Sequence, residues 1–187
     1  MKIKPNAASN ELSSPFYLIN KNFCSDFENY IANKNGKVKG NYNAWSYLIF
    51  GKINSPKNWT LMYKKSTFTS GNLLLSSKCQ NLLVLAEWET ERKGTHNSEF
   101  EIRRKSSTDF FRKIVNKSLS DLDLSDKYVL EIKNAKSPLI FKLTSILKSL
   151  FLSGEIYKIE HRNDKLKIEM RTEKHHFEIF DKLLIEI

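Results

Sequence analysis

Positively charged side chains are most concentrated in the segment 101–117, which reads EIRRKSSTDFFRKIVNK. The cluster consists of Arg103, Arg104, Lys105, Arg112, Lys113 and Lys117. Asp109 is the one acidic residue between its first and last members. Lysine and arginine side chains gathered in this way bind phosphate groups through charge and hydrogen bonds, whatever the base sequence of a nucleic acid. We therefore predict an anion-binding or nucleic-acid-binding site at these six residues.

The same segment also has a purely structural interpretation. On a helix capped by Ser106 or Ser107, the apolar side chains fall on one arc and the basic side chains on the opposite arc. Proteins that bind single strands expose aromatic side chains among their basic residues, so that bases can stack on them. Here Phe110 and Phe111 lie on the apolar arc, which is typical of an amphipathic helix with a solvated basic side. Both interpretations stay open at this point.

A second pattern that could do chemistry is DLDLSDKYVLEIKN, residues 121–134. An acidic residue followed by a strand that ends in Glu-x-Lys resembles the metal-binding segment of restriction-endonuclease-type nucleases. The resemblance implies that Asp121 or Asp123 holds a divalent ion together with Glu131, and that Lys133 positions a water molecule. A solvated strand in a lysine-rich protein has the same spacing, so the nuclease is kept only as a further alternative.

The histidines give no metal-binding motif. His175 and His176 are adjacent and cannot both face one way on a helix or strand. His161, His175 and Glu178 could in principle form a zinc trio, but neither an HExxH nor a C-x-x-C spacing supports it. We expect no catalytic residues, no metal and no cofactor.

The elements that must position these residues belong to an α+β fold, built mainly on antiparallel sheet and flanked by about four helices. Helices are predicted near 22–36, after Ser137-Pro138, and over 173–187, with a basic helix within 106–117 as discussed above. Strands are predicted over 43–53, 58–68, 81–91, 98–105 and 125–134. The C-terminal half then follows the order β-α-β-β-α.

The most specific local prediction is a hairpin over 155–171 that turns at Asn163-Asp164, a pair that tolerates positive φ. Closing the turn there puts apolar residues opposite each other on one face and opposite charges on the other. The expected pairs are His161 with Leu166, Ile159 with Ile168, Tyr157 with Met170, Glu160 with Lys167, and Lys158 with Glu169.

Length and composition limit the possible domain organisation and the cellular compartment. The 187 residues, with 40% hydrophobic content, suffice for a globular core. We expect a flexible tail over 1–14 and one domain over 15–187, with possible subregions 15–118 and 119–187. Two cysteines make no disulfide framework, and no signal peptide or membrane span is apparent, so we expect a cytoplasmic protein.

The net charge of +10 is informative about the binding partners of the protein and not about its fold. The leading hypothesis is a non-catalytic binding or interaction module whose partner is a protein or an anionic surface. The first alternative is a nucleic-acid-binding protein that uses the cluster at 103–117.

Overall fold

The computed structural model describes residues 2–69, 80–91, 98–109, 111, 118–134 and 137–187. The chain divides into two compact units. Unit 1 comprises residues 1–87 and 171–175, and unit 2 comprises residues 88–170 and 176–187. The division between residues 87 and 88 falls inside one strand, β5 (Gln80–Glu91), so this strand contributes to both units.

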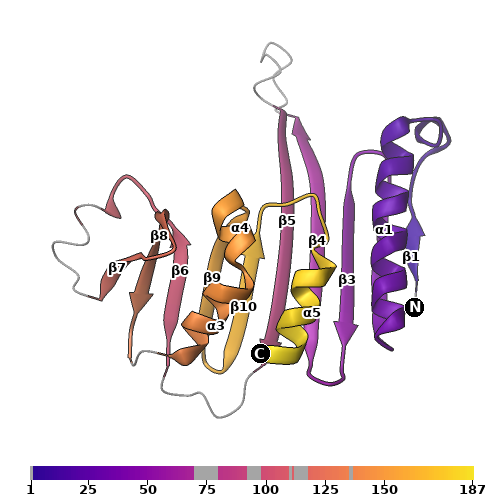
Figure 1. Cartoon of the computed structure of the whole chain (residues 1–187). Coiled ribbons are helices and arrows are strands. Elements are labelled where there is room, and N and C mark those ends of the chain that lie inside the picture. Colours follow the sequence, from indigo (N-terminus) through magenta and orange to yellow (C-terminus); the bar gives the residue numbers. More distant parts are fainter. Residues whose placement is uncertain (1, 70–79, 92–97, 110, 112–117, 135–136) are drawn as a thin grey trace. The chain divides into compact units, whose positions relative to one another are not determined.

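The architecture is α+β, as the sequence predicts, and its strands pair mainly in the antiparallel direction (Figure 1). The helices of the described residues are α1 (Pro15–Asn33), α3 (Pro138–Ile146), α4 (Lys148–Ser153) and α5 (Phe177–Glu186), with a 3-10 turn, η1 (Ser9–Glu11). The strands other than β5 are β1 (Ile3–Pro5), β2 (Lys37–Tyr42), β3 (Tyr47–Ile53), β4 (Trp59–Thr69), β6 (Phe100–Arg104), β7 (Leu119–Leu122), β8 (Ser125–Ile132), β9 (Ile156–Arg162) and β10 (Lys165–Met170). None of the described helices is long and apolar enough to cross a membrane.

Unit 1 is a sheet with the strand order β1-β2-β3-β4-β5 and one long helix packed on it. Strands β2, β3 and β4 form an antiparallel meander, and β1 pairs with β2 in the parallel direction. The helix α1 buries one stripe of residues against the sheet: Tyr17, Asn20, Cys24, Phe27 and Ile31. This stripe has the helical spacing of an amphipathic surface, so only one face of the sheet in unit 1 is covered by α1.

The helix α1 is longer than the sequence suggested. The predicted start near residue 22 is wrong, because the helix begins at Pro15 with Ser14 in the N-cap position. Its first turns carry exposed apolar side chains at Phe16, Leu18 and Ile19, which obscure the amphipathic pattern there. The predicted stop is confirmed, since the helix ends at Asn33 and Asn35 takes a positive φ of 53° before Gly36.

The five residues 171–175 complete the core of unit 1, although they follow β10 in the sequence. The ring of His175 stacks on Phe23 with the ring centroids 3.7 Å apart. The Tyr63 hydroxyl donates a hydrogen bond of 2.7 Å to the carbonyl oxygen of His175. A short connection thus supplies part of the packing between α1 and β4.

Residues 3–5, which the sequence analysis placed in a loose tail, form β1. The buried Ile3 side chain and the register Ile3 with Gly40 fix this strand at the edge of unit 1.

Unit 2 has the strand order β5-β10-β9-β6-β8-β7, with α3, α4 and α5 on one face. Figure 1 shows α3 and α4 over the β9–β10 part of this sheet, whereas β7 and β8 extend beyond them. The Tyr128 ring of β8 meets Phe151 of α4 edge to face, and its hydroxyl donates to the Ile156 carbonyl at 3.0 Å. The Ser137 hydroxyl accepts a hydrogen bond from Leu139 N and so caps α3, the helix predicted after Ser137-Pro138.

The predicted hairpin is β9 and β10. Asn163 and Asp164 have φ values of 50° and 60°, as a type I′ turn requires. Four of the five predicted pairs are confirmed. The fifth is wrong: a register shift between Glu169 and Met170 places Met170 opposite Ile156. The buried face packs under the helices, and the other face carries the charged side chains.

Candidate functional surfaces

Arg103, the first member of the predicted basic cluster, is held by a carboxylate of its own chain. Its two terminal nitrogens, Nη1 and Nη2, each donate a hydrogen bond of 2.7 Å to Asp109. Ser106 adds donations from its backbone N–H and its hydroxyl to the same carboxylate. These contacts with Arg103 and Ser106 lower the pKa of Asp109 well below its usual range, although burial opposes them. The positive charge of Arg103 is therefore largely neutralised by the Asp109 carboxylate.

Arg104 and Lys105 also have partners within unit 2. Arg104 Nε donates to the Ile156 carbonyl at 3.2 Å, and Lys105 Nζ lies 2.5 Å from an Asp121 carboxylate oxygen. Both side chains, together with Lys127, line an open cavity of about 430 Å³ beside Gly154. Arg112, Lys113 and Lys117 lie outside the described residues. The anion-binding role of this cluster stays a prediction.

The structure places Asp123 and Glu131 on opposite faces of the sheet, whereas Asp121, opposite Val129 in the register and paired with Lys105, lies on the face of Glu131. Asp123 lies in the turn between β7 and β8 and lines a groove on the helix-covered side. Leu130 and Ile132 line the same groove, so Glu131 between them points to the opposite face, where it pairs with Glu101 in the strand register. Lys133 lines a different and very small cavity.

His161, His175 and His176 each contact a group of their own unit. His161 is buried, and its Nδ1 contacts the Ser98 carbonyl oxygen. His175 Nε2 lies 2.9 Å from the Phe23 carbonyl oxygen, and His176 Nε2 lies 2.6 Å from Glu155 Oε2. These contacts give the three rings structural roles.

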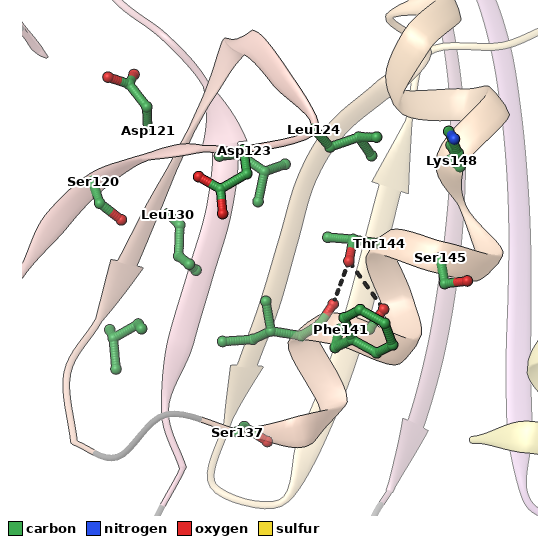
Figure 2. Close-up of a pocket in the computed structure, with 13 residues that line it drawn as sticks. Ser120, Asp121, Asp123, Leu124, Leu130, Ser137, Phe141, Thr144, Ser145 and Lys148 are labelled. Carbon is green, nitrogen blue, oxygen red and sulfur yellow. Dashed lines mark hydrogen bonds between the residues drawn. The ribbon is translucent and has the colours of Figure 1, made fainter.

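A groove in unit 2 lies between α3 and the β7–β8 hairpin and has a volume of about 760 Å³ (Figure 2). Its apolar lining consists of Leu122, Leu124, Leu130, Ile132, Ile140 and Phe141. Phe141 is 78% exposed, an unusual state for a phenylalanine beside other apolar side chains. The polar lining includes Asp123 and Lys148. We call this hollow the α3 groove.

A second surface lies on unit 1, on the face of β2, β3 and β4 that points away from α1. We call it the lysine face and define it by Lys37, Lys39, Leu48, Phe50, Lys52, Met62 and Lys64, all exposed or half-buried. The residues that alternate with them along each strand, such as Ile49, Ile53 and Leu61, are fully buried under α1. The lysine face is therefore the solvent side of a sheet whose other side is core.

The strand register arranges the lysine face in rows. Lys37, Lys52 and Thr60 lie side by side on three neighbouring strands, and Lys39, Phe50 and Met62 form the next row. Lys39 Nζ lies 5.4 Å from the centroid of the Phe50 ring. Two lysines directly opposite each other repel unless an anion lies between them. The arrangement thus combines paired positive charges with an accessible aromatic ring.

The charge is distributed unevenly between the two units. Unit 1 has 13 Lys and Arg against 5 Asp and Glu, and unit 2 has 18 against 16. Most of the net charge of +10 therefore belongs to unit 1, although the densest basic segment belongs to unit 2. The lysine face borders β5, where Glu87 is the first acidic residue on the solvent side.

Sequence reasoning missed the lysine face, although a signal for it exists. No Asp or Glu occurs from residue 29 to residue 86, a stretch of 58 residues that contains eight lysines. The absence of acidic residues identifies this surface better than the density of basic ones.

Comparisons with protein families, with curated proteins and with solved structures found no match to this chain.

Proposed function

We propose that this chain is a non-catalytic binding module for single-stranded nucleic acid and that the lysine face of unit 1 is the binding surface. The observation that carries the proposal is the row structure of this face, in which the opposed pair Lys37 and Lys52 lies beside a row that puts Lys39 next to the half-buried Phe50 ring. Phosphates of a bound strand would neutralise the lysines, and a base would stack on Phe50.

The electrostatics of the face support a polyanion as partner. Strands β2, β3 and β4 contain no acidic residue, so no carboxylate on these strands competes for the lysines of the face. In unit 2, by contrast, the solvent face is a set of ion pairs, such as Lys158 with Glu101 and Glu160 at 3.0 Å each. Lysines that are already paired gain little from a phosphate, whereas those of the lysine face gain a full counter-charge.

The aromatic ring favours a single strand over a duplex. The bases of a duplex are stacked on one another and cannot reach a ring on a flat sheet, whereas an unpaired base can. Met62 next to Phe50 extends the apolar strip on which such a base would lie.

The test is a fluorescence-anisotropy titration with a labelled single strand of about 15 nucleotides, a length within the range covered by one small binding surface. We expect the double variant Lys37→Gln, Lys52→Gln to weaken binding. The slope of the logarithm of the binding constant against the logarithm of the salt concentration should become shallower by about 0.7 for each lysine removed. The matched control is the double variant Lys21→Gln, Lys174→Gln, because both lysines are exposed in the same unit but lie outside β2, β3 and β4.

Two results would contradict the proposal. Equal effects of the two double variants would show that the net charge acts without a defined surface. Binding to vesicles that contain phosphatidylserine, with none to the oligonucleotide, would identify the lysine face as a membrane-surface site.

A further inference from the structure

We infer that the α3 groove of unit 2 docks a basic amphipathic segment of a partner protein. This inference is independent of the proposed function, which concerns unit 1. It is based on the apolar lining of the groove, on the position of its charges, and on the way the helix layer of unit 2 ends.

The helix wall of the groove is a second stripe on α3, distinct from the stripe that holds the helix to the core. Leu139 and Leu143 are buried and form the stripe of α3 that packs into the core of unit 2. Ile140, Phe141 and Thr144 line the groove instead, at the spacing that places them on one side of the helix. A helix with apolar residues on two sides is typical of an element that packs against two partners, and the described residues of unit 2 bury only one of these two sides.

The strand wall of the groove is the margin of the sheet. Leu130 and Ile132 of β8 point to the helix-covered side but are only half-buried. Figure 1 shows that β7 and β8 extend beyond α3, and none of the helices in the described part of the chain lies over them. An added amphipathic helix would occupy the next position in the helix layer and would bury these side chains together with Phe141.

The charges around the groove favour a basic segment. Figure 2 shows the Asp123 side chain turned toward the hollow, whereas Asp121 points away from it. Asp121 also borders the groove and is 54% exposed, although it pairs with Lys105, so the described lining holds two carboxylates against one lysine. Lys148 lies at the α4 end of the groove. A partner with a lysine or arginine near Asp123 and apolar side chains over Phe141 complements this surface.

The described part of the chain that follows β6 lies on the other face of the sheet. Asp109 binds Arg103, and the Arg103 side chain belongs to the charged face that carries Glu101 and Lys158. The groove is on the helix-covered face, so this segment up to Asp109 does not enter it.

The experiment is a selection of displayed peptides of about 15 residues, long enough for four helical turns, on the immobilised full chain. We expect the selected peptides to combine apolar residues at helical spacing with lysine or arginine. Synthetic copies should bind the Phe141→Ser variant and the Asp123→Lys variant about tenfold more weakly than the unchanged chain.

Matched controls separate the groove from general surface effects. Leu152→Ser removes another exposed apolar side chain, on α4 and outside the groove, and Asp126→Lys reverses a neighbouring charge outside it. Both controls should retain the affinity of the unchanged chain. The inference is overturned if no peptide is enriched, if the enriched peptides are acidic, or if the two groove variants bind as well as the controls.

Discussion

Gly51 of β3 lies directly against Ile31 of α1, closer than any other residue type would allow. A Cβ atom at Gly51 would lie 2.7 Å from both Cδ1 and Cγ1 of Ile31, and also 2.7 Å from Cζ of Phe27. At this point the side chains of Ile31 and Phe27 on α1 therefore pack directly against the backbone of β3. Gly51 faces this core, whereas its neighbours Phe50 and Lys52 belong to the lysine face on the other side of β3.

We expect Gly51→Ala to destabilise unit 1 by about 1–3 kcal/mol, because the added methyl group overpacks a core that is already in contact. Urea unfolding measures the change. Thr60→Ala, on the exposed side of β4, is the control and should stay within about 0.5 kcal/mol of the unchanged chain. Equal stability of both variants would show that α1 moves away from the sheet at no measurable cost.

The pair of Asp109 and Arg103 makes a prediction about pH. We expect Asp109→Asn to cost about 2 kcal/mol at neutral pH, a typical value for hydrogen bonds to a charged group. The folded state lowers the pKa of this carboxyl, so its contribution is complete above the pKa of the unfolded chain. The contribution decreases as the pH falls below about 4, where the unfolded carboxyl becomes protonated.

The measurement is urea unfolding of the unchanged chain and of Asp109→Asn along a pH series. The difference between them should decrease on the acidic side. Asp123→Asn, which changes an exposed carboxylate in a turn, is the control and should show a small difference at every pH. A difference for Asp109→Asn that is independent of pH would mean that its effect comes from packing rather than from charge.

The aromatic ring on the lysine face should determine the choice between single strand and duplex. We expect Phe50→Leu to weaken single-strand binding by about 1–3 kcal/mol, the usual value of one base stacked on an aromatic ring. Duplex binding, which depends on the lysines alone, should hardly change. Anisotropy titrations with both forms of one sequence measure the two affinities. A parallel loss for the single strand and the duplex would remove stacking from the proposal.

The thiol of Cys24 should be inert in the folded chain. Burial raises its pKa to about 12, with a further contribution from Glu28, and its side chain is 1% exposed. In a Cys79→Ser background, we expect no reaction with a thiol reagent at mildly alkaline pH until urea is added. The rate of labelling then reports the opening of unit 1. Fast labelling without denaturant would contradict the packing of α1 described above.

The hairpin of β9 and β10 shows how far sequence reasoning can go. All its pairing partners are close in the sequence. One register therefore pairs apolar residues on one face and opposite charges on the other, namely Glu160 with Lys167 and Lys158 with Glu169. The shift at Met170 could not be predicted, because nothing in the local pattern distinguishes a regular pair from a bulge.

The lysine face shows why surfaces are harder to predict than hairpins. Lys37 and Lys52 become neighbours only through the pairing of β2 with β3, and β2 itself, KVKGNY, carries a weak strand signal with a glycine inside it. The predicted cluster at 103–117 has the opposite difficulty. Its charges are adjacent in the sequence, but Asp109 folds back onto Arg103, and local density cannot reveal such a partner.

The connection 171–175 has a consequence for the order in which the protein can be made. A ribosome releases the chain from its N-terminus, so β1 to β4 emerge long before His175. Until then, Phe23 lacks the ring that stacks on it, and Tyr63 lacks the carbonyl that accepts its hydrogen bond. Unit 1 can therefore begin to fold before unit 2 is made. Its core is complete only when residues 171–175 have been synthesised, after nearly all of unit 2.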